Sequence, residues 1–361
     1  MCKCKIRRYF ENNADFFGCD FTLSFDESEI KILQLTDMQI IDSAGCRTPD
    51  RLRNDEKEAW KKENIEENCL NHISSVIAQT NPDVIVITGD LVYGSFDDSG
   101  EILKILIDFL DSFKIPWVPV FGNHDNEAYI GVDKQCEMLY ESEYCIFERG
   151  NVEGNSNFTV GIFKKNIPKR ILYMLDSKGC IDELGIFPNQ LELVLNRNKK
   201  IKDRFHLDVK GFMMFHNPVD WFNEAMLQKG YFTENRTNFV IGGNVPSQDG
   251  DIGFNFQNKF VRKACMKTDE NFLKTLNRCK IDGVFVGHYH TRAFSILYKG
   301  IKWVQGLKTG FYDYHSPGHS GGTLITLKNN DDFSVQFVDS LMPIKNIPSK
   351  APSYGNIFTD E

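Results

Sequence analysis

The sequence has no long apolar segment and no leader-like start. No window of about 18 residues is uninterrupted apolar sequence, so we expect no helix that crosses a membrane. The start, MCKCKIRRYFENNADFFGCDF, carries positive charge but lacks the apolar core of a signal peptide. These two absences predict an intracellular, cytoplasmic protein that has no membrane partner.

Positively charged residues are also fewer than negatively charged ones. The 361 residues include 42 Lys and Arg against 50 Asp and Glu, which gives a net charge of -8. This balance disfavours a broad basic surface, so we expect no nucleic-acid partner. The hydrophobic fraction of 41% and the charged fraction of 25% are typical of a globular chain that buries a large core.

Disulfide cross-links are not expected either, although the chain has ten cysteines. The cysteines are scattered along a long chain, and several lie inside apolar runs with helical spacing. A core of this size does not need covalent cross-links for stability. We therefore expect reduced and mostly buried thiols.

The chain divides into a long central region and two short ends. Residues 1–29 are predicted to be an N-terminal extension, and residues 346–361, rich in Pro, Ser and Gly, a C-terminal tail. The central region, 30–345, repeats one pattern, in which a short apolar run leads into a polar loop and then a helical segment. Runs of this kind are typical of strands buried on both faces. The predicted strands are 30–35, 83–88, 117–121, 170–175, 211–215 and 283–287.

Helical periodicity and hairpin patterns complete the expected architecture. Apolar residues recur with helical spacing in 64–79, 101–113 and 271–279. The segments 294–305 and 323–338 alternate about a turn, as antiparallel hairpins do. Strands that alternate with helices predict an α/β fold with some antiparallel edge.

Polar side chains stand just past the ends of five predicted strands. Ligands of open α/β sheets bind at the carboxyl ends of strands, so these side chains can converge. They are Asp37 and Gln39; Asp90 and Tyr93; Asn123, His124 and Asp125; His216; and His288 and His290. Carboxylates and imidazoles suit Zn, Mn, Fe and similar ions, and an aspartate can bridge two of them. The sequence therefore predicts a centre for two metal ions.

Each motif alone has an ordinary structural explanation. A Gly-Asp pair after a strand is usually a turn, and a lone histidine is more often packed or hydrogen-bonded than ligating. The combination is harder to explain in this way, because four of the eight histidines lie in these motifs. All five motifs, each after an apolar run, favour a functional site.

In this order the motifs resemble those of the calcineurin-like metallophosphoesterase superfamily. The family pattern is D-x-H, GD, GNH(D/E), a lone His and GHxH, and the resemblance covers about residues 30 to 345. The stretches PDVIVITGD, IPWVPVFGNHD, YMLDS and FPNQLE look like the branch that includes the purple acid phosphatase 16 and 29 type proteins. The resemblance implies a four-layer α/β/β/α sandwich of two mixed sheets flanked by helices.

The resemblance also implies a role for each matching residue. Asp37 and His290 would bind the first ion, and Asp90 would bridge the two. The second ion would have three ligands, which are Asn123, His216 and His288. The ions themselves would be divalent or of mixed valence, with Mn, Zn, Fe, Mg and Ni as candidates.

His124 and Asp125 would carry the acid–base chemistry in such a site. The family's equivalent of His124 protonates the leaving alkoxide or hydrogen-bonds to the phosphate. Asp125 would hold the His124 ring in the required orientation and tautomer.

One position departs from the family pattern. The usual histidine two places after the first aspartate is Gln39 here. A glutamine carbonyl oxygen can bind metal, although it is a poorer ligand than imidazole for a soft ion. Purple acid phosphatases lack this histidine and use the tyrosine of GDxxY, which corresponds to Tyr93. Either Gln39 or Tyr93 completes the first site, or Tyr93 only packs in the core.

The implied activity is hydrolysis of phosphate esters, with monoesters as the favoured class, by a metal-activated hydroxide. Two alternatives remain open: a phosphodiesterase acting on nucleotide-type substrates, and a non-catalytic scaffold that binds proteins. The expected partner is a small phosphate ester or a nucleotide-type compound.

Several loop residues could line the site. Arg47, Arg51 and Arg53 follow the first motif, and they either contact the phosphate or form a solvated helix start. The long segment 236–255 contains Asn244 and Asp249 as candidate polar contacts. His315 and His319 lie in a turn-rich stretch and are further candidates.

Overall fold

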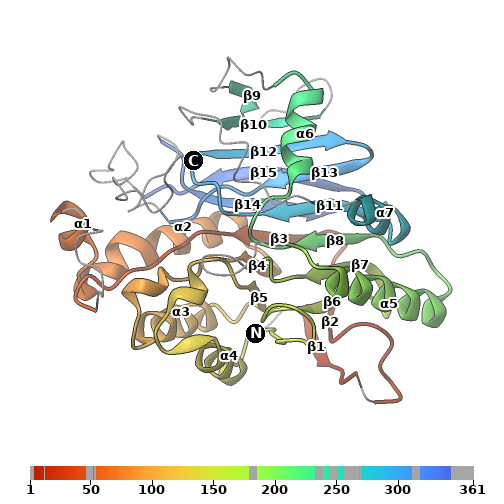
Figure 1. Cartoon of the computed structure of the whole chain (residues 1–361), viewed down its shortest axis with the longest axis horizontal. Coiled ribbons are helices and arrows are strands. Elements are labelled where there is room, and N and C mark those ends of the chain that lie inside the picture. Colours follow the sequence, from red (N-terminus) through yellow and green to blue (C-terminus); the bar gives the residue numbers. More distant parts are fainter. Residues whose placement is uncertain are drawn as a thin grey trace.

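Two sheets and the helices outside them form the protein (Figure 1). The computed structural model describes residues 4–11, 13–45, 52, 54–178, 185–231, 239–243, 250–255, 268, 270–310 and 318–342. All six predicted strands are present, and the two predicted hairpins pair antiparallel. The predicted α/β class and the four-layer arrangement with two mixed sheets are confirmed.

The smaller sheet has five strands. In spatial order they are β15 (Phe333–Asp339), β14 (Gly321–Leu327), β3 (Ile30–Leu35), β4 (Val84–Thr88) and β5 (Trp117–Val120). The last three run parallel to one another, whereas β14 pairs antiparallel with β3 and with β15. The strands β3, β4 and β5 therefore send their carboxyl ends to the same edge.

The larger sheet has ten strands. In spatial order they are β1 (Lys5–Arg8), β2 (Phe21–Phe25), β6 (Phe158–Lys164), β7 (Ile167–Met174), β8 (Gly211–Met214), β11 (Ile281–Val286), β13 (Ile301–Gln305), β12 (Arg292–Tyr298), β10 (Ile252–Asn255) and β9 (Phe239–Gly243). Its central strands β7, β8 and β11 are parallel neighbours. The N-terminal segment is thus part of the fold, because β2 pairs with β6 and β1 pairs with β2.

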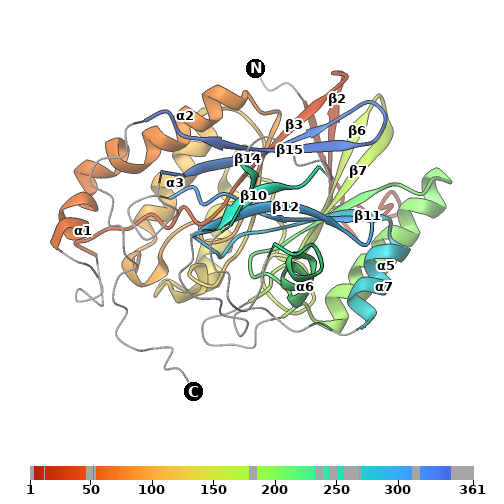
Figure 2. The same cartoon turned by 90° about the horizontal axis from the view of Figure 1, so that it is seen from above.

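Helices cover the outer faces of both sheets (Figure 2). The helices are α1 (Asn54–Ala59), α2 (Asn71–Thr80), α3 (Glu101–Ser112), α4 (Gly131–Glu141), α5 (Pro188–Phe205), α6 (Asp220–Gln228) and α7 (Glu270–Arg278). On the smaller sheet, α2 packs over β14, β15 and β3. On the larger sheet, α6 packs on β12 and β13, and α7 lies on β11 beside α5 (Figures 1 and 2).

Side-chain alternation along the central strands divides the interior into two cores. Leu172 and Met174 of β7 face a core that also contains residues of the smaller sheet, while Ile171 and Tyr173 face the helices. Successive side chains of a strand point to opposite faces, so a strand between two layers must be apolar on both sides. This requirement explains why the predicted strands are nearly continuous apolar runs.

The cysteines in the described part of the chain agree with the sequence-based expectation. Cys19, Cys69, Cys136 and Cys279 are buried, and they form no disulfide. The helices in the described part of the chain are too short or too polar to cross a membrane.

Arg170 joins the two sheets from within the core. Its guanidinium lies 4.4 Å from the ring centroid of Phe212 in the larger sheet and 5.5 Å from that of Phe333 in the smaller one. It also donates to the carbonyl oxygen of Asp331 at 2.8 Å and pairs with the carboxylate of Asp282. A buried charge that is both paired and stacked is costly to remove.

We expect Arg170→Met to lower the free energy of unfolding by about 2–3 kcal/mol, because Asp282 loses its buried partner. Urea unfolding followed by circular dichroism measures this change. The matched control is Lys169→Met on the same strand, whose side chain is 31% exposed and should matter little. Equal effects of the two substitutions would contradict a special role for Arg170.

Candidate metal centre

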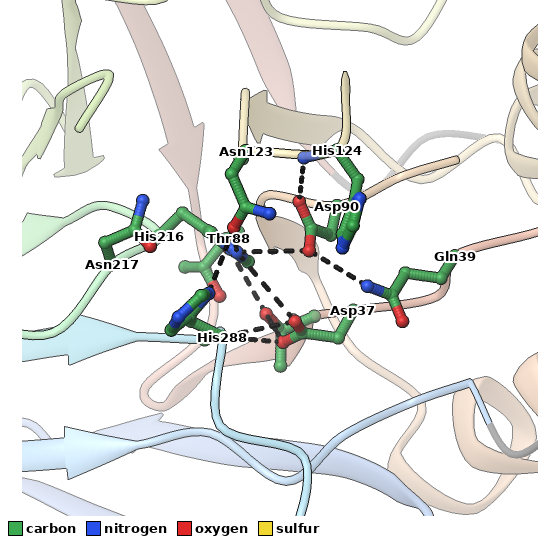
Figure 3. A network of polar contacts seen from close by, with 12 residues as sticks. Asp37, Gln39, Thr88, Asp90, Asn123, His124, His216, Asn217 and His288 are labelled. Carbon is green, nitrogen blue, oxygen red and sulfur yellow. Dashed lines mark hydrogen bonds and ion pairs between the residues drawn. The ribbon is translucent and has the colours of Figure 1, made fainter. Parts of the chain in front are cut away.

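The polar residues that follow five strands meet at one place (Figure 3). Three of these strands, β3, β4 and β5, belong to the smaller sheet, and β8 and β11 belong to the larger one. The carboxyl ends of the two parallel sets therefore supply side chains from opposite sides. Asp37, Asp90 and His216 offer ligand atoms that lie within 4.8 Å of one another, and all three residues are buried.

Four donor atoms form the tightest part of the cluster. The Nε2 atom of His216 lies 3.2 Å from Oδ2 of Asp90 and 3.1 Å from Oδ1 of Asn123. The Nδ1 atom of His288 lies 3.0 Å from the same Asn123 oxygen. We call these four residues, Asp90, Asn123, His216 and His288, the Asn123 half-site.

The tautomer of His216 can be assigned from its other ring nitrogen. Nδ1 lies 2.8 Å from the carbonyl oxygen of Thr88, which can only accept, so Nδ1 carries a hydrogen. In the neutral imidazole, Nε2 then presents a lone pair to the oxygens of Asp90 and Asn123. A divalent ion that takes the place of a proton on Nε2 would meet an imidazole nitrogen, a carboxylate oxygen and an amide oxygen, a donor set that suits it.

The second part of the cluster is sparser. Nε2 of His290 lies 3.2 Å from Oδ1 of Asp37, and both residues are buried. The Asp37 carboxylate also accepts hydrogen bonds from the backbone N–H of His288 at 2.9 Å and the hydroxyl of Thr36 at 2.7 Å. We call Asp37 and His290 the Asp37 half-site, and Asp90 of the Asn123 half-site lies next to it, with its ligand atom within 4.8 Å of that of Asp37.

The electrostatics of the centre favour a bound cation. Burial lowers the pKa of His216, but the carboxylates of Asp90 and Asp37 raise it to about 10. Burial likewise raises the pKa of Asp37, yet His216, His290 and Lys308 hold it well below its usual range. Burial and the neighbouring His216 lower the pKa of His288 to about 3. A metal ion would therefore find ionised carboxylates, and it would displace a proton from His216.

The backbone of the centre is strained at four of its own residues. Asp37, Gln39, Asp90 and His288 all have positive φ, at 53°, 46°, 53° and 75°. Residues other than glycine rarely adopt this region, and such strain gathers at functional sites. The surrounding fold therefore holds these side chains in positions that the local sequence would not choose.

Two glycines of the motifs leave room for side chains from other motifs. A Cβ on Gly122 would lie 2.3 Å from Oδ1 of Asp90, and one on Gly287 would lie 2.7 Å from Oδ2 of Asp37. No real Cβ approaches an oxygen this closely. The glycines of GNH and GH are thus required by close packing of the carboxylates.

Gln39 lies in the centre, but it does not point its oxygen at the cluster. Its amide nitrogen donates to Oδ2 of Asp90 at 3.1 Å, and its oxygen accepts from the ammonium of Lys308 at 2.9 Å. Lys308 is buried and also donates to the backbone oxygen of Asp37 at 2.9 Å. Lys308 could not be predicted to lie here, since nothing in its local sequence pattern indicates a site.

Tyr93 packs against the ring of His124. The two ring centroids are 4.0 Å apart with an angle of 31° between the planes, and the ring of Phe96 contacts Tyr93 from another side. Tyr93 is buried. The ring of Tyr93 thus packs in the core, and which residue completes the first site stays a prediction.

His124 has a carboxylate partner, but it is Glu127 and not Asp125. Nδ1 of His124 lies 2.9 Å from Oε2 of Glu127, three residues further on. Burial lowers the pKa of His124, whereas Asp90 and Glu127 raise it, and the net shift is upward. Glu127 was not among the predicted site residues, although a spacing of three residues in a helical turn often brings side chains together.

The orienting role predicted for Asp125 is therefore wrong. Its two carboxylate oxygens accept hydrogen bonds from the backbone N–H groups of Asp90, Leu91, Val92 and Gly122, at 2.7 to 3.3 Å. A carboxylate that faces four amide donors has no oxygen directed at the His124 ring. Asp125 instead ties the loop after β4 to the loop after β5.

Most of the predicted loop contacts lie outside the described residues. These contacts are Arg47, Arg51, Arg53, Asn244, Asp249 and His315. The predicted tail, 346–361, also lies outside the described residues. His319 is described, and its Nδ1 lies 3.2 Å from Oδ2 of Asp339 while its ring stacks on Phe254.

The chain belongs to the calcineurin-like phosphoesterase family, whose model matches residues 30–292. The predicted family resemblance is therefore confirmed. The match extends from β3 to the GHYH motif and includes every residue of both half-sites.

Individual relatives support the predicted branch. Two Arabidopsis thaliana proteins, probable inactive purple acid phosphatases 28 and 29, are 32% and 25% identical to the chain over 320 and 321 residues. Each match covers 81% of this chain, and 73% and 74% of the respective relatives. Phosphatase DCR2 of Saccharomyces cerevisiae is 27% identical over 211 residues, or 54% of this chain and 35% of that protein. The chain thus spans less than half the length of the yeast relative.

We expect divalent ions to stabilise the protein through the Asn123 half-site. A ligand at a hundred times its dissociation constant adds about 2.7 kcal/mol to the free energy of unfolding. Thermal unfolding with and without Mn²⁺ measures this gain, and His216→Ala should remove most of it. His206→Asn, which changes an exposed histidine, should keep the full gain. A gain that survives His216→Ala would contradict this placement of the site.

Asp125 and Glu127 should respond differently to loss of charge. Asp125→Asn places an amide nitrogen against backbone donors, and we expect it to cost about 2–3 kcal/mol of stability. Glu127→Gln retains an oxygen for the His124 ring and should cost less than about 1 kcal/mol. Urea unfolding of the two variants makes the comparison. If Glu127→Gln proves the more destabilising, the assigned roles are wrong.

Proposed function

We propose that this chain is a metal-dependent phosphoesterase that hydrolyses small phosphomonoesters. The observation that carries the proposal is the convergence of carboxylate, amide and imidazole donors next to a histidine with its own carboxylate partner. Family membership supports the same reaction class. The histidine, His124, is 17% exposed at its side chain, so a substrate can reach it.

Each of the two half-sites would hold one metal ion. Asp90, Asn123, His216 and His288 would hold one ion, and Asp37 and His290, sharing Asp90, would hold another. Mn, Zn, Fe, Mg or Ni would each suit oxygen and imidazole donors. A divalent ion there would supply Lewis acidity toward a phosphoryl oxygen and a means of activating water.

His124 would give a proton to the departing oxygen. Because Glu127 accepts from Nδ1, the imidazole is fixed in one orientation, and Nε2 is left to serve the substrate. Tyr93 supports the ring from its face. A negative partner favours the protonated imidazole, which is the form that a general acid requires.

The substrate class follows from the chemistry of the centre. A phosphate monoester offers several charged oxygens to a cationic site, and the proposed proton donor serves its leaving group. The net charge of -8 argues against a nucleic-acid substrate. A phosphodiester is the second candidate, and comparing nitrophenyl phosphate with its bis ester separates the two.

A non-catalytic binding role is the alternative from another class. Its support is that two similar proteins are named as probably inactive, and that Gln39 replaces a metal-binding histidine. The presence of His124, with Glu127 oriented on it, argues for catalysis. A protein that only binds partners would not need a paired proton donor.

We expect His124→Asn to lower kcat for nitrophenyl phosphate by about 10²-fold or more, the usual contribution of a general acid. Glu127→Gln should lower kcat about tenfold with little change in KM, because it loosens the ring without removing it. His206→Asn and Glu137→Gln make the same changes at exposed positions and should have no effect. If the protein is inactive with every divalent ion, or if His124→Asn retains full activity, the proposal is wrong.

A further inference from the structure

We infer that the two half-sites bind metal unequally, because Gln39 and Lys308 together keep the Asp37 half-site from holding an ion as tightly as the Asn123 half-site does. This inference rests on the proposed metal-dependent function. It concerns how many ions the protein retains, and it makes Lys308 a determinant of the metal content.

The orientation of the Gln39 amide is fixed by its two partners. Asp90 has an ionised carboxylate and can only accept, whereas the Lys308 ammonium can only donate. The amide nitrogen must therefore face Asp90, and the oxygen must face Lys308, as the distances of 3.1 and 2.9 Å show. Turning the amide over would set donor against donor and acceptor against acceptor. The only atom of Gln39 that could bind a metal is thus held by Lys308.

The amide of Gln39 also donates a hydrogen bond to the Asp90 oxygen that would bridge two ions. Oδ2 of Asp90 lies 3.2 Å from Nε2 of His216, on the side of the Asn123 half-site. The N–H of Gln39 reaches this oxygen as well. A second ion on Asp90 would have to displace a hydrogen bond that Lys308 holds in place. Figure 3 shows Gln39 directed at Asp90 from the side away from His216.

Lys308 adds a positive charge where a second cation would bind. It is 1% exposed, and its ammonium donates to Oε1 of Gln39 and to the backbone oxygen of Asp37. Only one amide group separates this ammonium from the Asp90 carboxylate. Like charges repel strongly in a buried setting, so the ammonium opposes a divalent ion on Asp37.

The Asn123 half-site shares Oδ2 of Asp90 with the N–H of Gln39, but it has three further donor residues, which are Asn123, His216 and His288. Three contacts of 3.0 to 3.2 Å join its four donor atoms, and Nδ1 of His216 donates its hydrogen away from them, to Thr88. The Asp37 half-site keeps one carboxylate and His290, with an amide N–H where the family has an imidazole. The first set therefore offers an ion more ligands, and the second has the buried ammonium of Lys308 beside it.

The test is a titration of the metal-free protein with Mn²⁺ by calorimetry, with Mn²⁺ electron paramagnetic resonance as a second readout. We expect one tightly bound ion per chain and any second ion to bind at least about tenfold more weakly. The resonance spectrum should be that of an isolated ion. Two ions of comparable affinity in the unaltered protein, with a spin-coupled spectrum, would overturn the inference.

Gln39→Glu is the decisive variant, since it is isosteric and removes the N–H that faces Asp90. The new carboxylate keeps its contact with Lys308 and gives the Asp37 half-site another oxygen ligand. We expect a second ion to bind within about tenfold of the first. Lys308→Met should move the titration in the same direction. Gln79→Glu, which adds the same charge at an exposed position, should leave one tight ion.

The outcomes separate this inference from the function on which it rests. One tight ion that becomes two in Gln39→Glu supports both. Two equal ions in the unaltered protein leave the proposed function standing and overturn the inference. No second ion in a folded Gln39→Glu also overturns it. No bound ion at all would remove the proposed function as well.

Discussion

The close approach of four metal-type donor atoms at the Asn123 half-site is the constraint on which the rest of the structure depends. The oxygens of Asp90 and Asn123 and the nitrogens of His216 and His288 approach to 3.0–3.2 Å inside the protein. Burial lowers the pKa of His216, but the carboxylates of Asp90 and Asp37 raise it to about 10, so a proton on this imidazole balances Asp90 when no metal is bound. A divalent ion that displaces this proton finds a matching set of oxygen and nitrogen donors. Building this half-site strains the backbone, because Asp90 and His288 both have positive φ. It also requires a glycine at position 122, which lies against Asp90. A centre assembled against these costs is best explained by an ion that it binds.

The two-sheet architecture makes this convergence possible. Parallel strands in each sheet end at one edge, and packing of the sheets brings the two edges together. Arg170 and the shared apolar core fix the distance between the sheets, while Asp125 joins the loops after β4 and β5. Side chains distant in the sequence therefore meet with little freedom. Stability of the fold and geometry of the site are thus linked through the same contacts.

Much of the fold could be predicted from the sequence, and so could most of the site. Strands buried on both faces leave apolar runs with clear ends, as β3 shows, and polar residues after those ends mark the centre. The involvement of β1 and β2 could not be predicted, because strand pairing depends on distant partners. The position of Lys308 in the site could not be predicted for the same reason, because its partner Gln39 lies 269 residues away in the sequence. Asp125 was misassigned because the sequence cannot show which acceptor faces the backbone amides and which faces His124.

The most direct test of the central claim is an anomalous diffraction map from crystals of the protein grown with Mn²⁺. The account predicts a peak bounded by Oδ2 of Asp90, Oδ1 of Asn123, Nε2 of His216 and Nδ1 of His288. A map with no peak among these atoms, from crystals that bind Mn²⁺ elsewhere, would contradict it. In that case the cluster would be a buried polar network, and the proposed chemistry would lose its basis.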